Sequence, residues 1–455
     1  MTFDLNFILP LFPVFIAMAL AILFSNYNSI TNRSKKKLPP GELGLPWIGE
    51  TLDFYKAQKK NKLYEHFIKP RIQKNGKTFK TRLMGSPTVV VNGAEANKFF
   101  LSNEFKLVVS SWPSSSVQLM GSDSIMEKQG EAHRCVRGII ATSLSCSGLE
   151  AMVPKICKTV QFHLDENWQG KEIISLYRLT RSLTFTIVLE CMLGIEVKPN
   201  MLGMFERVLE GVFSPPIKFP GSAFLRAKNA RMEIEKMLLD ILRKKREEIH
   251  EFQQGEGEEG GAGMLLFRLV MAMIQGEMSE KEVLDNVVLL VFAAHDTTSF
   301  AITMTFRMLA HHPNCYSQLL QEHLDIRNNK RPGETLTLED IKKMNYTWQV
   351  ARESMRMFPP ILAHSERPLQ TLNMMDLLFQ KAGRFDDPVQ PYAYLPFGGG
   401  PRQCAGYQLA KLNILILVNF VVTQYEWSLV NPEEPIAVDP LPFPSQGMPI
   451  RISPK

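Results

Sequence analysis

The sequence predicts a mainly helical protein with a minor β component, an α+β fold, attached to a membrane by one N-terminal helix. Three observations predict this fold: an uncharged apolar run near the N-terminus, helical periodicity over most of the chain, and one hairpin signal. Of the 455 residues, 45% are hydrophobic and 22% are charged, as in folded globular proteins. The net charge of +6 is modest, so no nucleic-acid partner is expected. The six cysteines show no paired C-x-x-C spacing, so reduced thiols are expected.

The apolar run at residues 7–24 carries no charge. As a helix it is about 27 Å long, which is close to the ~30 Å hydrocarbon layer, so residues 1–30 are predicted to form a membrane anchor. Arg33 and Lys35–Lys37 follow the run, and Asp4 precedes it. The positive-inside rule therefore places the body of the protein in the cytosol, and we expect a single-pass protein of the endoplasmic reticulum membrane. The alternative is a cleaved signal peptide, whose positive charge would precede the apolar run.

The rest of the chain reads as one linker and one domain. Residues 31–48 are basic and rich in proline and glycine, which predicts a stiff linker, and residues 49–455 are expected to form the catalytic domain. The β-branched runs in 79–93 predict a hairpin. Apolar positions at helical spacing in 226–251 predict an amphipathic helix, interpreted as a solvated surface helix. The Gly-rich, acidic stretch 251–263 predicts a flexible surface loop.

A glycine-rich loop with one cysteine carries the strongest chemical signal. Residues 397–406 read FGGGPRQCAG and are followed by an apolar helical segment. Glycines allow a tight loop to pass close under a flat cofactor, and the helix N-terminus beyond Cys404 favours a thiolate. An axial thiolate donates electron density to haem iron and favours cleavage of the O–O bond. The alternative is a Gly-rich turn before a core helix, with Cys404 as a small buried residue.

This loop resembles the cysteine loop of the cytochromes P-450. Its residues match the pattern F-x-x-G-x-R-x-C-x-G at Phe397, Gly400, Arg402, Cys404 and Gly406. Three further motifs occur in the family's order, and together the resemblance covers nearly the whole chain. The resemblance implies the cytochrome P-450 fold.

An acid and a hydroxyl residue stand together upstream of the loop. The stretch AAHDTT that begins at Ala293 is similar to the family's A-G-x-D/E-T-T/S, with Ala294 in place of the usual glycine. The resemblance implies that Asp296 and Thr297 are the catalytic pair, because dioxygen activation needs protons through a short relay. The alternative is a set of polar side chains bonded back to their own helix.

Two more motifs resemble the family in structural positions. Glu353 and Arg356 match E-x-x-R, whose spacing permits an ion pair on one helical face, and Arg384 matches the later arginine that completes a structural triad. The stretch that contains His133 and Arg137 resembles the helix that meets the haem propionates. The alternative for these two residues is an ordinary surface histidine and arginine.

The resemblance therefore implies a haem-thiolate monooxygenase. Cys404 would bind the iron of haem b as its metal ligand, and electrons would come from NADPH through NADPH-cytochrome P-450 reductase. The implied cofactor-binding residues are Cys404, Arg402, Phe397, Gly398, His133 and Arg137. Segments such as LPPGELGLPWIGE resemble the plant group that oxidises triterpenoid and taxane skeletons, so a large apolar terpenoid is the implied substrate.

Residues 361–384 depart from the family's pattern, which places strands and a haem-propionate arginine there. When codons allowed for Ile361–Asp376 are read from their third bases, one choice of codons gives FGSFRKAFTDIEYDG, which resembles the missing block. The hypothesis is a frame-shifted or mis-spliced transcript, with part of the sheet absent. It leads to an alternative function, a catalytically impaired haem-binding remnant. Sequencing the gene across Pro360–Arg384 tests the hypothesis, and a clean in-frame reading with no shifted alternative contradicts it.

Overall fold

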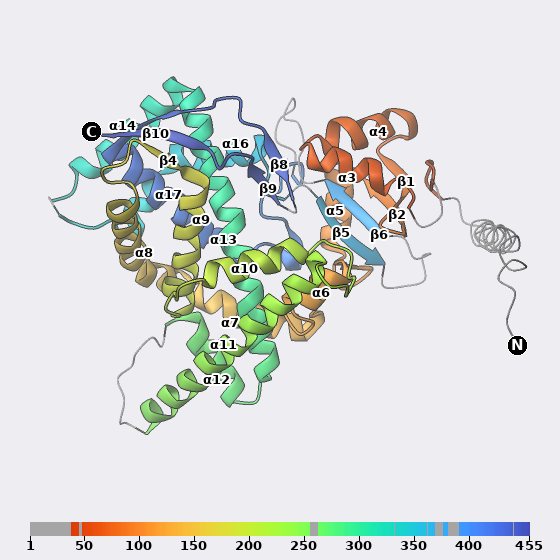
Figure 1. The fold of residues 1–455 in the computed structure, drawn as a ribbon, viewed down its shortest axis with the longest axis horizontal. Helices are drawn as coiled ribbons and strands as arrows, with labels where there is room; N and C mark the ends of the chain where they lie inside the picture. Colours follow the sequence, from red (N-terminus) through yellow and green to blue (C-terminus); the bar gives the residue numbers. More distant parts are fainter. Residues whose placement is uncertain are drawn as a thin grey trace, which may run out of the picture.

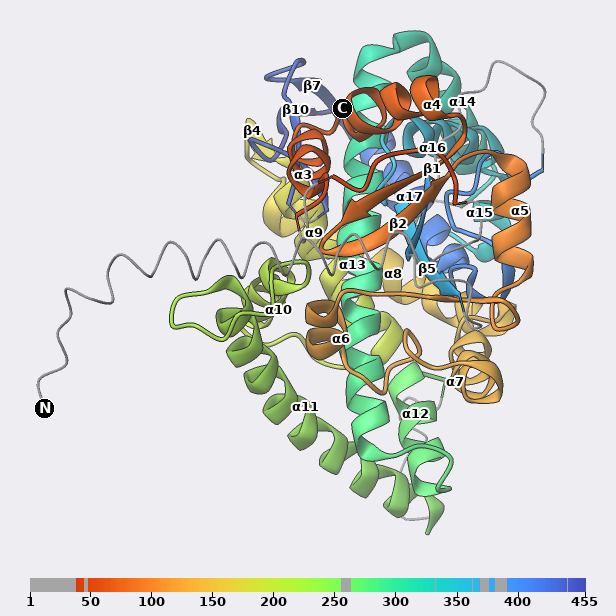
Figure 2. The same cartoon turned by 90° about the vertical axis from the view of Figure 1, so that its right-hand side faces the viewer.

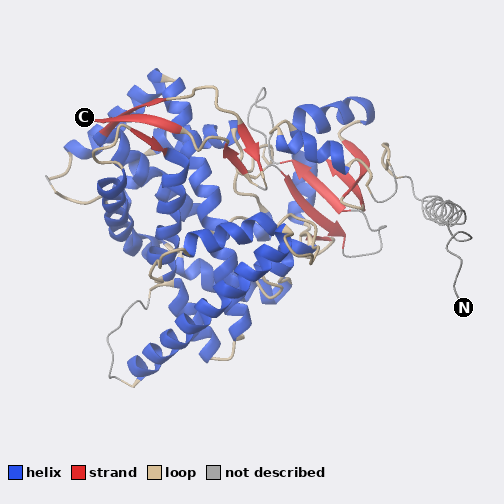
Figure 3. Ribbon diagram, viewed as in Figure 1, coloured by secondary structure: helices blue, strands red, loops and turns tan. Residues whose placement is uncertain are grey.

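A computed structural model describes residues 38–44, 48–254, 263–331, 333–361, 363–368, 376–380, 391–439 and 441–455. Helices dominate this part of the chain, as Figure 3 shows in blue, and the predicted helical fold with minor strands is confirmed. The α-helices are α3 (Thr51–Lys59), α4 (Lys69–Asn75), α5 (Ala94–Ser102), α6 (Ser114–Met120), α7 (Gly130–Ser143), α8 (Cys146–Asn167), α9 (Leu176–Thr186), α10 (Met201–Gly211), α11 (Ala223–Gln253), α12 (Leu265–Ile274), α13 (Glu280–His311), α14 (Pro313–Asn328), α15 (Leu338–Lys343), α16 (Asn345–Met357) and α17 (Tyr407–Gln424).

The remaining elements are short. Two π-helical segments are η1 (Tyr64–Ile68) and η2 (Ile187–Leu193), and a 3-10 turn is η3 (Gly400–Arg402). The strands are β1 (Thr78–Leu83), β2 (Ser86–Val91), β3 (Val108–Ser110), β4 (Ile173–Ser175), β5 (Ala363–Pro368), β6 (Asp376–Gln380), β7 (Tyr425–Leu429), β8 (Ile436–Val438), β9 (Pro442–Pro444) and β10 (Pro449–Pro454). They form sheets in the orders β1-β2-β6-β5-β3, β4-β10-β7 and β8-β9. The first sheet lies beside the helical body with α3, α4 and α5, at the right of Figure 1.

The predicted hairpin forms at β1 and β2. The two strands pair antiparallel, from Thr78 opposite Val91 to Leu83 opposite Ser86. The turn residues Met84 and Gly85 have φ angles of 52° and 83°. A two-residue turn with both φ angles positive matches the twist of the strands, and glycine at the second position makes it accessible. A small apolar cluster that includes Phe67 and Phe79 packs beside this hairpin.

The main core lies in the helical body around α13 and α17. Figure 2 shows α13 running the length of this body. A capping box between Ser279 and Glu282 fixes its start. Among the described residues, α13 is the one helix that is long and apolar enough to cross a membrane, but 72% of its most apolar stretch is buried in the protein. It is therefore a core helix, and the predicted anchor at residues 1–30 lies outside the described residues.

Two other sequence expectations meet different outcomes. The amphipathic helix predicted within 226–251 is α11, whose apolar positions Ile234, Leu238 and Leu242 are buried, so this face belongs to the core rather than to a fully solvated helix. Residues 255–262 of the predicted loop lie outside the described residues. None of the six cysteines is in a disulfide.

The segment 361–384 contributes strands where the structure describes it. β5 and β6 pair antiparallel, and β6 pairs parallel with β2, from Thr88 opposite Asp376 to Val91 opposite Phe379. This corrects the expectation that part of the sheet is absent at these positions. The unpaired backbone groups along β2 accept an extended segment whatever its side chains are, so the pairing does not require the family's own sequence. The frame-shift hypothesis itself stays a prediction about the gene.

A buried histidine joins three helices of the core. The Nδ1 atom of His323, on α14, lies 2.9 Å from Asn419 Nδ2 on α17, and its Nε2 atom lies 2.9 Å from Thr347 Oγ1 on α16. The Asn419 amide can only donate to Nδ1, so Nε2 carries the hydrogen. Burial lowers the pKa of His323 to about 4, and the ring is neutral in the folded protein at pH 7.

We predict that His323 makes the protein acid-sensitive. The folded-state pKa lies below the unfolded value of about 6.5, so the unfolded state binds the extra proton between these values. The contribution of His323 to the free energy of unfolding is complete above pH 6.5 and decreases by about 1.4 kcal/mol per pH unit as the pH falls towards 4. In urea unfolding at pH 7 and pH 5, His323→Gln should lose less stability on acidification than the wild type.

The matched control is His312→Gln, because His312 is exposed. This variant should keep the wild-type difference between the two pH values. An unchanged pH dependence in His323→Gln would contradict the prediction.

Candidate active site

The cysteine loop is a tight turn packed against α5. Gly400 has a φ angle of 66°, and a Cβ atom there would lie 2.2 Å from the backbone oxygen of Leu101. Only glycine fits this close approach. The Cys404 N–H donates to the Phe397 carbonyl at 2.9 Å, which closes the loop just before α17 begins at Tyr407. The loop therefore presents Cys404, which is exposed, at the N-terminal end of an apolar core helix.

Aromatic side chains hold the other side of the loop. The rings of Phe397 and Tyr407 meet edge to face with centroids 4.7 Å apart, and Trp348 of α16 lies 6.2 Å from Phe397 and 5.9 Å from Tyr407. Phe397 therefore packs against α16 and α17 rather than standing open to solvent. Gly398 has a φ angle of 70°, so it provides the turn and brings no side chain into the loop.

Arg402 attaches the loop to a distant segment. Its Nε atom donates to Glu104 Oε1 at 2.5 Å, and its two Nη atoms donate to the carbonyls of Ile125, Met126 and Lys128 at 2.8 to 3.2 Å. Glu104 is 4% exposed. These bonds use four of the five N–H groups of the guanidinium, so most of its hydrogen-bonding capacity is committed to the protein.

His133 and Arg137, both on α7, lie near this loop. Burial, and then the charges of Arg402 and Arg137, lower the pKa of His133 to about 4, so its ring is neutral at pH 7. Burial also lowers the pKa of Arg137, and the negative charge of a Cys404 thiolate opposes this effect. Arg137 makes no hydrogen bond or ion pair with the residues that the structure describes.

These positions fit a haem with anionic propionates. A half-buried guanidinium without a protein partner is costly, and an added anion would satisfy it. On α13, Ala293 is exposed and Thr297 is half-buried, although most of this helix is buried. As a thiolate, Cys404 would supply the soft, anionic donor that haem iron takes.

Asp296 and Thr297 do not bond to each other. The Thr297 hydroxyl donates to the Ala293 carbonyl at 2.8 Å. The buried Asp296 carboxylate accepts from Arg181 Nε of α9 at 2.7 Å, and Arg181 also pairs with Glu206 of α10 at 2.7 Å. The two side chains therefore start from neighbouring positions and leave the helix in different directions.

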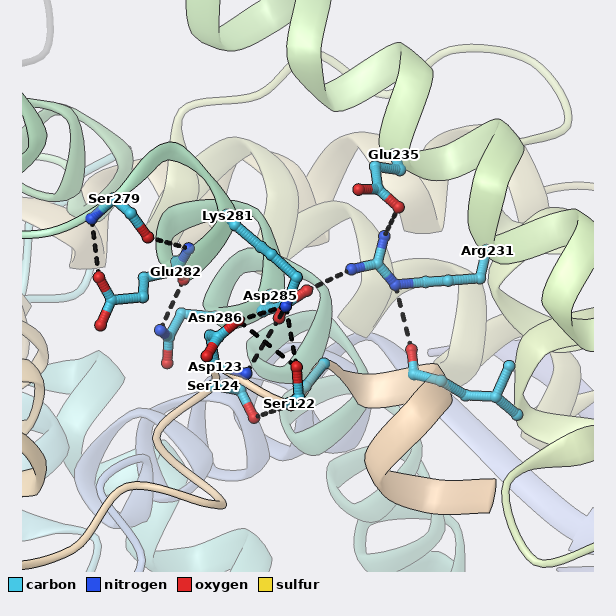
Figure 4. A network of polar contacts seen from close by, with 12 residues as sticks. Ser122, Asp123, Ser124, Arg231, Glu235, Ser279, Lys281, Glu282, Asp285 and Asn286 are labelled. Carbon is cyan, nitrogen blue, oxygen red and sulfur yellow. Dashed lines mark hydrogen bonds and ion pairs between the residues drawn. The ribbon is translucent and has the colours of Figure 1, made fainter. Parts of the chain in front are cut away.

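A second buried ion pair lies about three turns closer to the start of α13. Arg231 of α11 donates to Asp285 Oδ1 at 2.7 Å, and both side chains are less than a tenth exposed. Figure 4 shows Arg231 reaching Asp285 from one side and Lys281 from the other.

The segment 121–128 connects this ion pair to the cysteine loop. The backbone N–H of Asp123 donates to Asp285, and that of Ile125 donates to Asn286. Carbonyls of the same segment accept from Arg402. Figure 4 shows Asp123 and Ser124 in the polar network beside α13.

The E-x-x-R residues form a bidentate pair on α16. Arg356 donates through Nε and Nη2 to Glu353 at 2.8 and 2.6 Å. The Glu353 side chain is 56% exposed, so this pair alone contributes little stability. The predicted third member, Arg384, lies outside the described residues.

Three residues of the site were not predicted from the sequence. Glu104 and Arg181 are the ion-pair partners of Arg402 and Asp296, and each is more than a hundred positions away from its partner. No local spacing connects such residues. His295 lies inside the AAHDTT stretch, at a position where the motif accepts any residue, and its contact with Asp296 at 3.2 Å appears only in the structure.

Comparison with known proteins gives one consistent result. The family model for cytochrome P450 matches residues 39–381 and 379–451, two matches that meet inside the stretch 361–384. Taxoid 14-beta-hydroxylase of Taxus cuspidata is 34% identical over 456 residues, which cover 93% of this chain and 89% of that protein. Protopanaxadiol 6-hydroxylase of Panax ginseng is 32% identical over 464 residues, which cover 95% and 96%.

A solved structure agrees with these relatives. Retinoic acid bound cyanobacterial CYP120A1 matches with a TM-score of 0.80 at 27% identity, and the match covers 93% of this chain and 100% of that one. The curated relatives are named hydroxylases, which is consistent with an oxidoreductase. The chain belongs to the cytochrome P450 family, within the plant group that includes the taxane and triterpenoid hydroxylases.

Proposed function

We propose that this protein is a haem-thiolate monooxygenase that hydroxylates an apolar terpenoid. It uses O2 and electrons that NADPH-cytochrome P450 reductase supplies, and residues 1–30 attach it to the endoplasmic reticulum membrane. The observation that carries the proposal is the placement of Cys404 in a glycine loop at the start of α17, beside Arg137, a cation that has no ion-pair partner among the described residues. Membrane lipid and the reductase are therefore its expected partners.

Different residues of the chain would hold different parts of the haem. Bound haem would supply the iron at which O2 is reduced. Cys404 would ligate that iron, and Arg137 and His133 would bind the propionates, where a neutral His133 can still donate one N–H. Arg402 holds the loop that carries Cys404, because its guanidinium binds Glu104 and three carbonyls. Its contribution to the cofactor is therefore mainly indirect.

Thr297 and Asp296 are the proposed source of protons for the reaction. The Thr297 hydroxyl is held by Ala293 on the accessible stretch of α13, where it can pass a proton to oxygen. Asp296 is one residue away and is held by Arg181. The pair would keep protons available inside a site that excludes bulk water.

The substrate class comes from the relatives. The similar proteins are named for acting on taxoids, taxanes and protopanaxadiol. We infer a large, apolar terpenoid skeleton for this chain. These relatives give no support to the alternative of an impaired haem-binding remnant, and reconstitution of the chain with its reductase separates the two functions.

We predict that Arg402→Ala destabilises the protein and releases haem. Removing the guanidinium leaves the buried Glu104 carboxylate unpaired, which costs about 3–5 kcal/mol. Urea unfolding followed by circular dichroism gives the loss in the free energy of unfolding, and absorbance gives the haem content of the folded fraction.

Arg134→Ala is the matched control, since Arg134 pairs with Glu131 on the exposed face of α7 with both side chains more than three-quarters exposed. It should change stability by less than about 1 kcal/mol. An Arg402→Ala protein as stable as this control would contradict the assignment.

We predict that Thr297→Ala uncouples NADPH use from hydroxylation. The full chain is reconstituted with its reductase and a panel of triterpenoid and taxane skeletons, and products one oxygen atom heavier are sought by mass spectrometry. Without the hydroxyl, product formed per NADPH should fall by about 100-fold, and the missing electrons should appear as hydrogen peroxide.

Thr305→Ala is the control, because Thr305 makes the same backward hydrogen bond on α13, to Ala301 at 2.8 Å, but is buried. Thr305→Ala should leave the product formed per NADPH unchanged. A wild-type protein that folds and binds haem but oxidises no skeleton would instead select the impaired remnant.

A further inference from the structure

His295 stands immediately before the proposed acid Asp296 and is fully buried. Its ring packs against Phe185 and Phe292, with centroids 5.5 and 6.3 Å away. Nothing in the motif or in the proposed reaction assigns a task to this side chain. A buried imidazole needs partners for both nitrogens, so the two contacts of the ring define its chemical state.

The hydrogen positions follow from the partners. His295 Nδ1 lies 2.8 Å from the carbonyl oxygen of Val291, which can only accept, so Nδ1 carries a hydrogen. In a neutral ring the lone pair would then be on Nε2, which lies 3.2 Å from Asp296 Oδ2. A carboxylate oxygen also only accepts. Two lone pairs would face each other inside the protein, and neither atom has another hydrogen-bond partner in the part of the chain that the structure describes.

The other described groups around the pair leave Asp296 Oδ2 without a donor. From α9, Arg181 donates to Asp296 Oδ1 at 2.7 Å, and from α10, Glu206 pairs with Arg181. Tyr177 of α9 stays neutral, because burial and the Asp296 charge raise its pKa. The Glu206 side chain is 39% exposed, whereas His295 and Asp296 are buried, so His295 is the one described residue placed to supply a donor to Asp296 Oδ2.

We propose that His295 is a positioning residue that holds one proton jointly with Asp296. This proton converts the contact between Nε2 and Oδ2 into a charge-assisted hydrogen bond and keeps the carboxyl group paired with both His295 and Arg181. An exchangeable proton is thereby stored one residue from Thr297. The catalytic consequence rests on the proposed function, whereas the shared proton itself is a property of the folded chain.

The first test counts protons released on unfolding. Above pH 7 an unfolded histidine and an unfolded aspartate both lack this proton, so unfolding of the wild type should release one proton from the pair. The pH dependence of unfolding between pH 7 and 8.5, measured on the full chain, gives the number. His295→Gln and Asp296→Asn should each release one proton fewer, and the double variant should lose no more than either single variant.

His323→Gln is the matched control, because both ring nitrogens of this buried histidine face neutral partners, Asn419 and Thr347. Its proton count above pH 7 should equal that of the wild type. The inference is overturned if His295→Gln also releases the wild-type number of protons.

The direction of the stability change provides a second readout. If the proton is shared, His295→Gln replaces the charge-assisted hydrogen bond to Asp296 Oδ2 with at most a neutral one, and the melting temperature should fall. If the ring were neutral, the glutamine amide would replace a repulsive contact with a hydrogen bond, and the melting temperature should stay or rise. The latter result would overturn the inference.

The role of His295 in catalysis is tested by the amount of product formed per NADPH consumed. His295→Gln should lower product formed per NADPH with little change in KM, because substrate contacts are unchanged. If His295→Gln forms as much product per NADPH as the wild type, His295 has no role in catalysis. Failure of the wild type to oxidise any terpenoid would remove the proposed function, while the proton count would still decide whether the proton is shared.

Discussion

The buried carboxylates of α13 impose the constraint around which the site is arranged. A helix that runs through the core must pack apolar side chains on most sides, yet α13 carries Asp285 and Asp296 at positions that are almost fully buried. A buried carboxylate needs a cation and further hydrogen bonds. Arg231 from α11 and Arg181 from α9 provide these cations, about three turns apart along the same side of the helix.

This constraint extends to the cysteine loop through the backbone of residues 121–128. The Asp285 carboxylate and the Asn286 side chain accept backbone N–H groups from this segment, and its carbonyls accept from Arg402. Gly121 is required at the contact, because a Cβ atom there would lie 2.1 Å from the Asp285 side chain. The position of Cys404 relative to α13 therefore depends on a continuous set of hydrogen bonds between elements far apart in the chain.

Local sequence patterns predicted those parts of the structure that a short segment determines by itself. The β1-β2 hairpin follows from β-branched runs around a turn, and the glycine loop before α17 follows from residues 397–406. The partners of Arg402 and Asp296 could not be predicted, because Glu104 and Arg181 are selected by tertiary packing and not by spacing. The burial of α11 was underestimated for a similar reason, since its charged C-terminal turns dominate the pattern while its apolar stripe faces the core. The strands β5 and β6 form from a segment without the expected sequence pattern, because an open sheet edge pairs with backbone groups.

Whether the chain binds haem through Cys404 is decided by a reduced carbon-monoxide difference spectrum. The spectrum is recorded on the full chain in microsomes, beside Cys404→Ser and the exposed-cysteine control Cys135→Ser. We expect the Soret band of thiolate-ligated haem for the wild type and for Cys135→Ser, and its loss in Cys404→Ser. A folded wild-type chain that shows no such band, or a Cys404→Ser protein that retains it, would show that Cys404 is not the haem ligand.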